Sequence, residues 1–237
     1  MSTLDPMPGQ PALKGRRELK HVITRMDCHL LRHNLQQVMT LDPHAKKDGQ
    51  YLIRSVYFDN FDNKILNQKK EGMFHRDKYR IRLYDYNTSF IHLEKKSKRD
   101  NLCYKQKCRI TAEEYTRLNR GDIAWMEEDA RPLMRELHTH MNLFQLKPVA
   151  VVDYVREVYI YEQGNVRVTF DSSIRTSYKD TDILNPDLIM VDTVDPNTVI
   201  LEVKYDEYLP DVIKLLLQVR DSRKTSFSKY QYSRMYG

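Results

Sequence analysis

The sequence predicts an α+β fold in which about eight mostly antiparallel strands are covered by several helices. The main observation is a set of strand-like segments, between residues 16 and 204, with charge on every second residue; Tyr79-Arg80-Ile81-Arg82-Leu83 is the clearest. Residues two apart in a strand point to the same face, so each segment presents one charged row. Such rows indicate strands around a shared cationic lining, whose repulsion favours a polyanionic ligand. The other rows are Arg16, Glu18 and Lys20; Glu94, Lys96 and Lys98; Lys105, Lys107 and Arg109; and Glu202 with Lys204.

The composition is that of a globular protein. Of 237 residues, 41% are hydrophobic and 30% are charged, which excludes collagen-like and disordered classes. A net charge of +6 permits nucleic acid, an anionic membrane surface or a phosphate-rich substrate as the partner. The odd count of 3 cysteines argues against a secreted disulfide scaffold and favours a reducing compartment. We therefore expect a cytoplasmic protein.

The chain is expected to form one domain after a short leader. Residues 1–14 contain three prolines and no apolar core of a secretory signal, so they predict a disordered leader. The remaining residues, 15–237, suffice for one strand-rich domain. No apolar stretch reaches the length of about 18 residues that a transmembrane helix requires.

The first half of the chain alternates strands with two helices. Asp27 is expected to cap a helix that runs to Met39, with Leu31 and Leu35 among its apolar positions. A short helix is expected over 62–70. The expected strands are 16–24, 51–58, 78–85, 89–96 and 102–110. The last three form a meander with polar turns at Asn87-Thr88 and Arg99-Asp100.

The second half begins with the sharpest local signal. Thr111 and Glu114 form a capping box, and the helix they start is expected to stop at Gly121. A further helix is expected over 130–141. Pro210 opens a last helix, whose apolar face is broad enough to lie against a sheet. The expected strands are 149–161, 165–171 and 199–205.

Seven motifs occur in an order that resembles one known family. They are Arg16-Arg17-Glu18-Leu19-Lys20, Arg54-Ser55-Val56-Tyr57-Phe58-Asp59, Lys78-Tyr79-Arg80-Ile81-Arg82, Leu93-Glu94-Lys95-Lys96, Tyr154-Val155-Arg156, Leu201-Glu202-Val203-Lys204 and Phe227-Ser228-Lys229-Tyr230. Together they resemble the VTC domain, the polyphosphate polymerase domain of the vacuolar transporter chaperone, in its stand-alone bacterial form. This domain belongs to the triphosphate tunnel metalloenzymes, and the resemblance covers residues 14–234.

The resemblance implies an eight-stranded antiparallel β-tunnel whose inward side chains bind phosphate chains with Mn²⁺ or Mg²⁺. The implied activity is an ATP-dependent polyphosphate polymerase, a phosphotransferase that moves the γ-phosphate of ATP onto a growing chain. The implied partners are ATP and polyphosphate or tripolyphosphate. A membrane-protein partner would place the protein peripherally on a membrane; no nucleic acid is expected. Two alternatives remain open: a tripolyphosphatase or nucleoside triphosphatase, and a non-catalytic polyphosphate-binding module.

The resemblance also carries site residues over to this chain. The catalytic set is Arg80, Arg82, Lys96, Lys107, Arg156, Arg167, Glu202 and Lys229. Lys20 and Tyr154 join these residues, without Glu202, in binding substrate, and Glu202 is the metal residue. One departure concerns Ser226, which stands where the polymerases have a basic residue, with Lys224 nearby. Polymerase activity therefore depends on whether a neighbouring position supplies that contact.

The chemistry supports these assignments independently. An arginine fork takes two phosphate oxygens at once, and lysine supplies a mobile charge. Glu202 lies on an otherwise apolar strand, and a hard divalent cation accepts one carboxylate together with waters and substrate oxygens. Glu94 is expected to orient Lys96 through a salt bridge, and Glu18 to pair across strands. Lys105 is expected at the rim. No glycine-rich phosphate loop is present, which excludes a P-loop ATPase.

Overall fold

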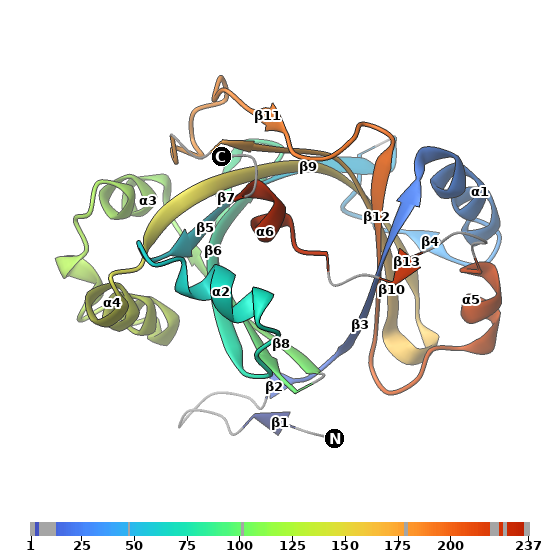
Figure 1. Ribbon diagram of the computed structural model, residues 1–237, viewed down its shortest axis with the longest axis horizontal. Coiled ribbons are helices and arrows are strands. Elements are labelled where there is room, and N and C mark those ends of the chain that lie inside the picture. The colour runs from blue at the N-terminus through green and yellow to red at the C-terminus, as the bar shows by residue number, and fades with distance from the viewer. Residues whose placement is uncertain are drawn as a thin grey trace. The chain divides into compact units, whose positions relative to one another are not determined.

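The computed structural model (Figure 1) divides by its contacts into two compact units that interleave along the chain. The residues that it describes are 3–4, 13–46, 48–100, 102–177, 180–218, 223–224 and 227–234. Unit 1 comprises Met1–Leu52, Tyr154–Ile174 and Val194–Ser228, and unit 2 comprises Ile53–Asp153, Arg175–Thr193 and Lys229–Gly237. One domain over 15–237 stays a prediction.

The expected leader, 1–14, lies mostly outside the described residues. Its described parts are two short strands, β1 (Thr3–Leu4) and β2 (Leu13–Lys14), which pair antiparallel.

The described strands confirm the antiparallel fold class. The order of the main sheet is β13-β3-β12-β10-β9-β5-β6-β7-β8, and every recorded register is antiparallel. The eight long strands are β3 (Arg17–Thr24), β5 (Gln50–Asp59), β6 (Arg76–Tyr84), β7 (Asn87–Arg99), β8 (Leu102–Ile110), β9 (Lys147–Tyr161), β10 (Val166–Ser177) and β12 (Thr198–Tyr205). The two-residue strands are β4 (Thr40–Leu41), β11 (Val191–Asp192) and β13 (Arg223–Lys224).

Six α-helices occur in the described residues. They are α1 (Arg25–Leu35), α2 (Lys64–Lys70), α3 (Ala112–Asn119), α4 (Pro132–Phe144), α5 (Asp211–Leu216) and α6 (Lys229–Ser233). The capping box of α3 is confirmed, because Thr111 accepts from the Glu114 amide and Glu114 accepts from the Thr111 amide. Short 3₁₀ turns cover Ala124–Met126 and Gln163–Asn165. No helix among the described residues is long and apolar enough to cross a membrane.

Several local predictions need correction. Thr24 rather than Asp27 caps α1, because Asp27 is the third helical residue and closes a capping box with Thr24. The β6–β7 turn lies at Asp85 and Tyr86 rather than at 87–88, with φ of 48° and 56° at the two residues. A two-residue hairpin turn of type I′ requires positive φ at both positions, which a tyrosine does not signal in sequence. Helix α1 ends at Leu35 rather than at Met39, and helix α4 spans Pro132–Phe144 rather than 130–141.

Unit 1 has its core on one face of β3, β12 and β10. Alternate residues of these strands, such as Leu201 and Val168, pack against Leu31 and Leu35 of α1. Helix α5 adds Ile213 to this core and lies beside α1 (Figure 1). Its apolar face is narrower than predicted, because Leu215 is 66% exposed. The opposite face of the strands is left for charged residues.

In unit 2, strands β6, β7 and β8 likewise have one apolar face covered by helices and one charged face. Helices α3 and α4 lie together beside these strands (Figure 1) and contact β7 and β8. Fully buried Ile81, Leu83 and Leu93 belong to the covered face, and Tyr79 donates to Glu136 of α4 across 3.0 Å. The strands therefore present alternate residues, including Arg80 and Arg82, on their other face.

Candidate functional site

The strand register of unit 2 gathers cations on one face. Lys78 pairs with Lys96, Arg80 with Glu94, Lys96 with Lys105, and Glu94 with Lys107. Paired residues on adjacent antiparallel strands share a face, at about 7 Å per two residues along a strand and about 4.8 Å between strands. We call this set the cationic face: Lys78, Arg80, Arg82, Glu94, Lys96, Lys105 and Lys107. It holds six cations and one carboxylate.

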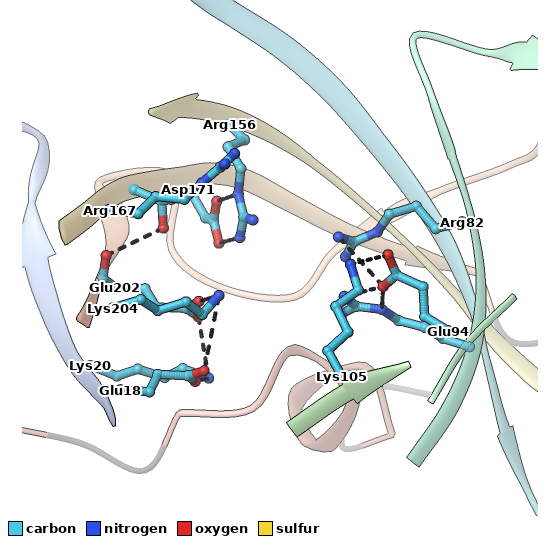
Figure 2. Close-up of polar contacts among 12 residues, drawn as sticks. Glu18, Lys20, Arg82, Glu94, Lys105, Arg156, Arg167, Asp171, Glu202 and Lys204 are labelled. Carbon is cyan, nitrogen blue, oxygen red and sulfur yellow. Dashed lines mark hydrogen bonds and ion pairs between the residues drawn. The ribbon is translucent and has the colours of Figure 1, made fainter. Parts of the chain in front are cut away.

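Glu94 is the centre of the cationic face. Glu94 is 1% exposed, and its carboxylate accepts a hydrogen bond from Arg80 Nε at 2.7 Å. Lys105 also forms an ion pair with it, and Arg82 Nη1 lies at 4.0 Å (Figure 2). Arg82 is further fixed by donating from Nε to Ser55 Oγ across 3.0 Å. One buried carboxylate is thus shared by three cations.

The pKa values reflect this excess of positive charge. Burial by itself raises the pKa of Glu94, but Arg80, Arg82 and Lys105 outweigh it and hold the pKa well below its usual range. Burial also lowers the pKa of Lys105, against the opposing effect of Glu94 and with the help of Arg80. The Lys105 side chain is 42% exposed, so solvent screens part of this repulsion. The face therefore disfavours further positive charge and favours anions.

Tyr57 of β5 belongs to the same surroundings. It is the register partner of Arg80, and its hydroxyl lies 3.4 Å from Arg80 Nη1. Burial raises the pKa of this phenol, but the charges of Arg80, Arg82 and Lys229 outweigh it and lower the pKa. Lys229 is the first residue of α6, and its neighbour Tyr230 contacts Tyr57 directly.

Two further contacts hold α6 in place. The ring of Tyr230 stacks on Tyr57 with 5.3 Å between centroids, and its hydroxyl donates to Asp59. Asp59 is fully buried and also accepts the amides of Ile65 and Leu66 at the start of α2. The end of β5 and the Lys229-Tyr230 step are therefore linked, although 171 residues separate Asp59 from Tyr230.

Unit 1 carries a second polar group, which we call the carboxylate cluster: Glu18, Lys20, Glu202 and Lys204. On β3 and β12, Lys20 pairs in register with Glu202 and Glu18 with Lys204. Lys20 Nζ lies 2.5 Å from Glu18 and 3.3 Å from Glu202, and Lys204 forms an ion pair with Glu202 (Figure 2). Two lysines and two glutamates alternate here, so the cluster is close to neutral.

Two arginines of unit 1 are held by aspartates. Arg156 donates from Nε and Nη2 to the two oxygens of Asp171, both at 2.6 Å (Figure 2). Burial lowers the pKa of Arg156, but Asp171 outweighs this effect and raises it well above the usual value. Tyr154 is buried, with its ring centroid 5.2 Å from the Arg156 guanidinium. Arg167 pairs with Asp42 at 2.8 Å, and its side chain is 35% exposed.

Glu18 and Glu202 are the residues of the carboxylate cluster that could hold a divalent cation. The carboxylates of Glu18 and Glu202 both approach one ammonium, that of Lys20, so a single cation already lies between them. Carboxylate oxygens are the ligands that Mg²⁺ and Mn²⁺ prefer. The described residues contain no group of three His, Cys, Asp or Glu that forms a complete cage. A metal here would depend on water and substrate oxygens as well.

The predicted site residues fall into two sets, one in each unit. Unit 2 holds Arg80, Arg82, Lys96, Lys107 and Lys229, and unit 1 holds Lys20, Tyr154, Arg156, Arg167 and Glu202. Ser226 lies outside the described residues. The recorded ion pairs of Glu94 differ from the expected one, since they join Arg80, Arg82 and Lys105. Glu18 pairs with Lys20 on its own strand as well as across to Lys204.

Sequence reasoning missed the parts played by Lys105 on the cationic face and by Tyr57 beside it. Lys105 was expected at the rim, yet it reaches Glu94; the signal was its position two residues before Lys107 on the same strand. Tyr57 received no role, although it follows Ser55 by two residues and so points to the same face.

Comparison with known proteins agrees with this architecture. The family model of the VTC domain matches residues 15–236, whereas no curated protein is significantly similar. HpAC1 from Hippeastrum, described as an adenylyl cyclase candidate with a dominant triphosphatase activity, has a TM-score of 0.56 at 16% identity, over 93% of this chain and 96% of its own. The PH1819 protein from Pyrococcus horikoshii OT3 has a TM-score of 0.51 at 13% identity, over 94% of this chain and 99% of its own.

These likenesses show a shared fold and confirm the predicted fold class. The family match is more specific, because it covers nearly the whole sequence and includes all seven motifs. The protein belongs to the VTC domain family.

Proposed function

We propose that the protein is an ATP-dependent polyphosphate polymerase, which moves the γ-phosphate of ATP onto a phosphate chain with Mn²⁺ or Mg²⁺. The observation that carries this proposal is the cationic face, where six cations lie on adjacent strands and three of them, Arg80, Arg82 and Lys105, share the buried carboxylate of Glu94. Without a ligand such a surface is unfavourable because like charges repel. A bound polyanion removes that repulsion, and a phosphate chain does so at several cations at once.

The spacing of the cations supports a chain rather than a single phosphate. Lys78, Arg80 and Arg82 succeed one another on β6, at about 7 Å per step. Arg80 and Arg82 would hold phosphate oxygens through their forks, and Lys105 would add a mobile charge. In phosphoryl transfer the protein mainly positions the reacting groups and neutralises their charge, and these side chains can do both.

Glu202, with Glu18 beside it, would hold the divalent ion. When bound, the ion supplies positive charge to phosphate oxygens. The residues of unit 1 are ordered by their own pairs: Glu202 pairs with Lys20 and Lys204, and Asp171 holds Arg156 in a fixed orientation. Arg167 is more exposed than Arg156 and so is better placed to meet an anion from solvent.

A second candidate is a tripolyphosphatase. The fold that this chain shares with HpAC1 favours it, because that protein is described as having triphosphatase activity. Replacing the acceptor chain by water would change little in the cationic face. The product therefore separates the two candidates, and binding without any product would indicate a polyphosphate-binding module.

The test is incubation of the purified protein with ATP and Mn²⁺ or Mg²⁺. Gel detection of phosphate polymer and an assay of free phosphate are run on the same samples. We expect polymer, and orthophosphate without polymer would contradict the polymerase proposal in favour of the hydrolase.

Replacing Arg80 and Arg82 together by alanine should weaken tripolyphosphate binding until it is no longer measurable. Hydrogen bonds to charged groups contribute about 1.5–3 kcal/mol each, so losing two arginines weakens binding roughly 100-fold or more. Calorimetric titration measures the change. The matched control is Arg120→Ala with Arg135→Ala, which removes the same charge from exposed positions outside the face. Unchanged affinity in the Arg80/Arg82 variant would contradict the proposed role of the face.

Replacing Glu202 by glutamine should lower metal-dependent turnover about 100-fold or more, because the charge of a bound ion stabilises the transition state by several kcal/mol. Most of the tripolyphosphate affinity measured without metal should remain, since the cationic face is intact. Turnover is measured beside Glu207→Gln, which changes an exposed glutamate of the same unit. Retained turnover would remove Glu202 from the metal role.

A further inference from the structure

A cavity of about 410 Å³ opens beside the start of β6 in unit 2. Helix α2, the first residues of β6 and the end of α4 form its wall. It reaches Tyr79, whose side chain lies on the helix-covered face of β6 and not on the cationic face. The lining residues that matter here are Lys64, Ile65, Gln68, Arg76, Tyr79 and Phe144.

The cavity has an excess of positive charge. Among the described residues, Lys64 and Arg76 have no carboxylate within ion-pair distance. Asp77 is the one carboxylate of the lining, and Arg99 Nη2 at 2.8 Å and Lys95 Nζ at 3.5 Å already pair with it. Two cations therefore face the cavity without a counter-charge from the described chain.

Arg76 is the stronger of the two anion donors. Its guanidinium donates to the Met73 carbonyl oxygen across 2.7 Å. Burial lowers its pKa, which is the behaviour of a cation that has lost water without gaining an anion. A desolvated guanidinium with free donors binds phosphate in a forked arrangement.

The rest of the lining is aromatic and apolar. Phe144 is 38% exposed at the mouth, while Tyr79 and Ile65 are buried in the wall. Lys64 Nζ lies 3.6 Å from the centroid of the Phe144 ring, so this ring is the partner that the ammonium has among the described residues. Such a contact is weak at an exposed position, and an anion would draw the ammonium away and uncover the ring.

We propose that this cavity is a second anion-binding site, which takes a nucleoside phosphate. Its phosphate would meet Arg76 and Lys64, and its base would lie on Phe144, with the Gln68 amide able both to donate and to accept at the base edge. The volume is within the range of about 300–1,000 Å³ for small-molecule sites. Inorganic phosphate alone would leave the apolar wall uncovered.

The test uses adenosine monophosphate and the full chain, with Arg80→Ala and Arg82→Ala to silence the cationic face. We expect this variant to bind one nucleotide per chain. Adding Lys64→Glu should weaken binding about tenfold or more, since it reverses a charge that contacts the phosphate. Adding Lys70→Glu, on the same helix but outside the lining, should not. Phe144→Ala tests the base contact without changing charge, and thermal unfolding verifies that each variant is folded.

Four results would overturn the proposal. Nucleotide binding could vanish with the Arg80/Arg82 change alone, or survive both Lys64→Glu and Phe144→Ala. Inorganic phosphate could bind as tightly as the nucleotide, which would leave an anion site with no base. Finally, phosphatidylglycerol vesicles could bind through Lys64 while the nucleotide does not, which would make the cavity a lipid site.

Discussion

Replacing Glu94 by glutamine should destabilise the unliganded protein. The change keeps the shape of the side chain but removes the charge that Arg80 approaches at 2.5 Å and that Lys105 and Arg82 share. Removing one partner of a buried ion pair costs about 3–5 kcal/mol. The lower end applies here, because the Lys105 side chain is 42% exposed and water can screen it. A loss of about 3 kcal/mol lowers the Tm of a chain this size by about 6–12 °C.

The same change should strengthen tripolyphosphate binding. In the wild type the ligand shares its cations with Glu94, whereas in the variant it meets Arg80, Arg82 and Lys105 alone. If the ligand recovers half of the lost 3 kcal/mol, affinity rises about tenfold. Stability and affinity thus move in opposite directions, which distinguishes this account from simple damage to the fold.

The assay is thermal unfolding with and without saturating tripolyphosphate, together with calorimetric titration. Glu113→Gln is the matched control, since Glu113 is an exposed glutamate on α3. The ligand should raise the Tm of Glu94→Gln by more than that of the wild type. Equal stability and equal affinity in the two proteins would refute the view of Glu94 as the counter-charge of the face.

The pH dependence of folding stability tests the role of Glu94 independently. Because the folded-state pKa of Glu94 is depressed, its contribution to stability is present above the ordinary carboxyl pKa of about 4.3 and is lost as pH falls through the folded value. The stability of the wild type should therefore fall more steeply than that of Glu94→Gln below about pH 4. Parallel acid profiles would show that Glu94 is not held in its charged form.

Two further outcomes follow from single contacts. Arg156→Met leaves the fully buried Asp171 without its bidentate partner, so chemical denaturation should report a loss of about 3–5 kcal/mol, most of it recovered by adding Asp171→Asn. In the wild type, tripolyphosphate affinity should fall between pH 7 and 10, because ionisation of the Tyr57 phenol, whose pKa is lowered, adds negative charge beside Arg80. Calorimetric titration should show a smaller fall for Tyr57→Phe, which has no phenol to ionise. Identical pH profiles would exclude this ionisation.

The sequence was sufficient for the elements of the fold because their signals are local. The capping box of α3 and the alternation along β6 each involve residues a few positions apart. The turn at Asp85 and Tyr86 was misplaced, since tertiary pairing of the two strands imposes positive φ on a tyrosine that has no such preference. The apolar face of α5 was predicted to be broader than it is, because periodicity shows an apolar face without showing what covers it, and Leu215 is exposed.

The site was less accessible to sequence reasoning, because register decides which charges meet. Alternation places Arg80, Lys96 and Lys105 on one face of their own strands, but it does not say that Glu94 stands opposite Arg80. A shift by one residue would have sent Glu94 to the helix-covered face. Asp59 and Tyr230 show the same limit, since their contact spans 171 residues.

The two units differ in how their charged side chains are paired, and this difference bears on the proposed mechanism. On the cationic face like charges gather around Glu94, whereas in the carboxylate cluster Lys20 and Lys204 are held by glutamates. These lysines become available to phosphate only when another cation neutralises Glu18 and Glu202. Binding of a divalent ion and of a phosphate chain should therefore be mutually favourable. The Glu202→Gln variant tests this as well, because tripolyphosphate affinity should depend on Mn²⁺ in the wild type and lose that dependence in the variant.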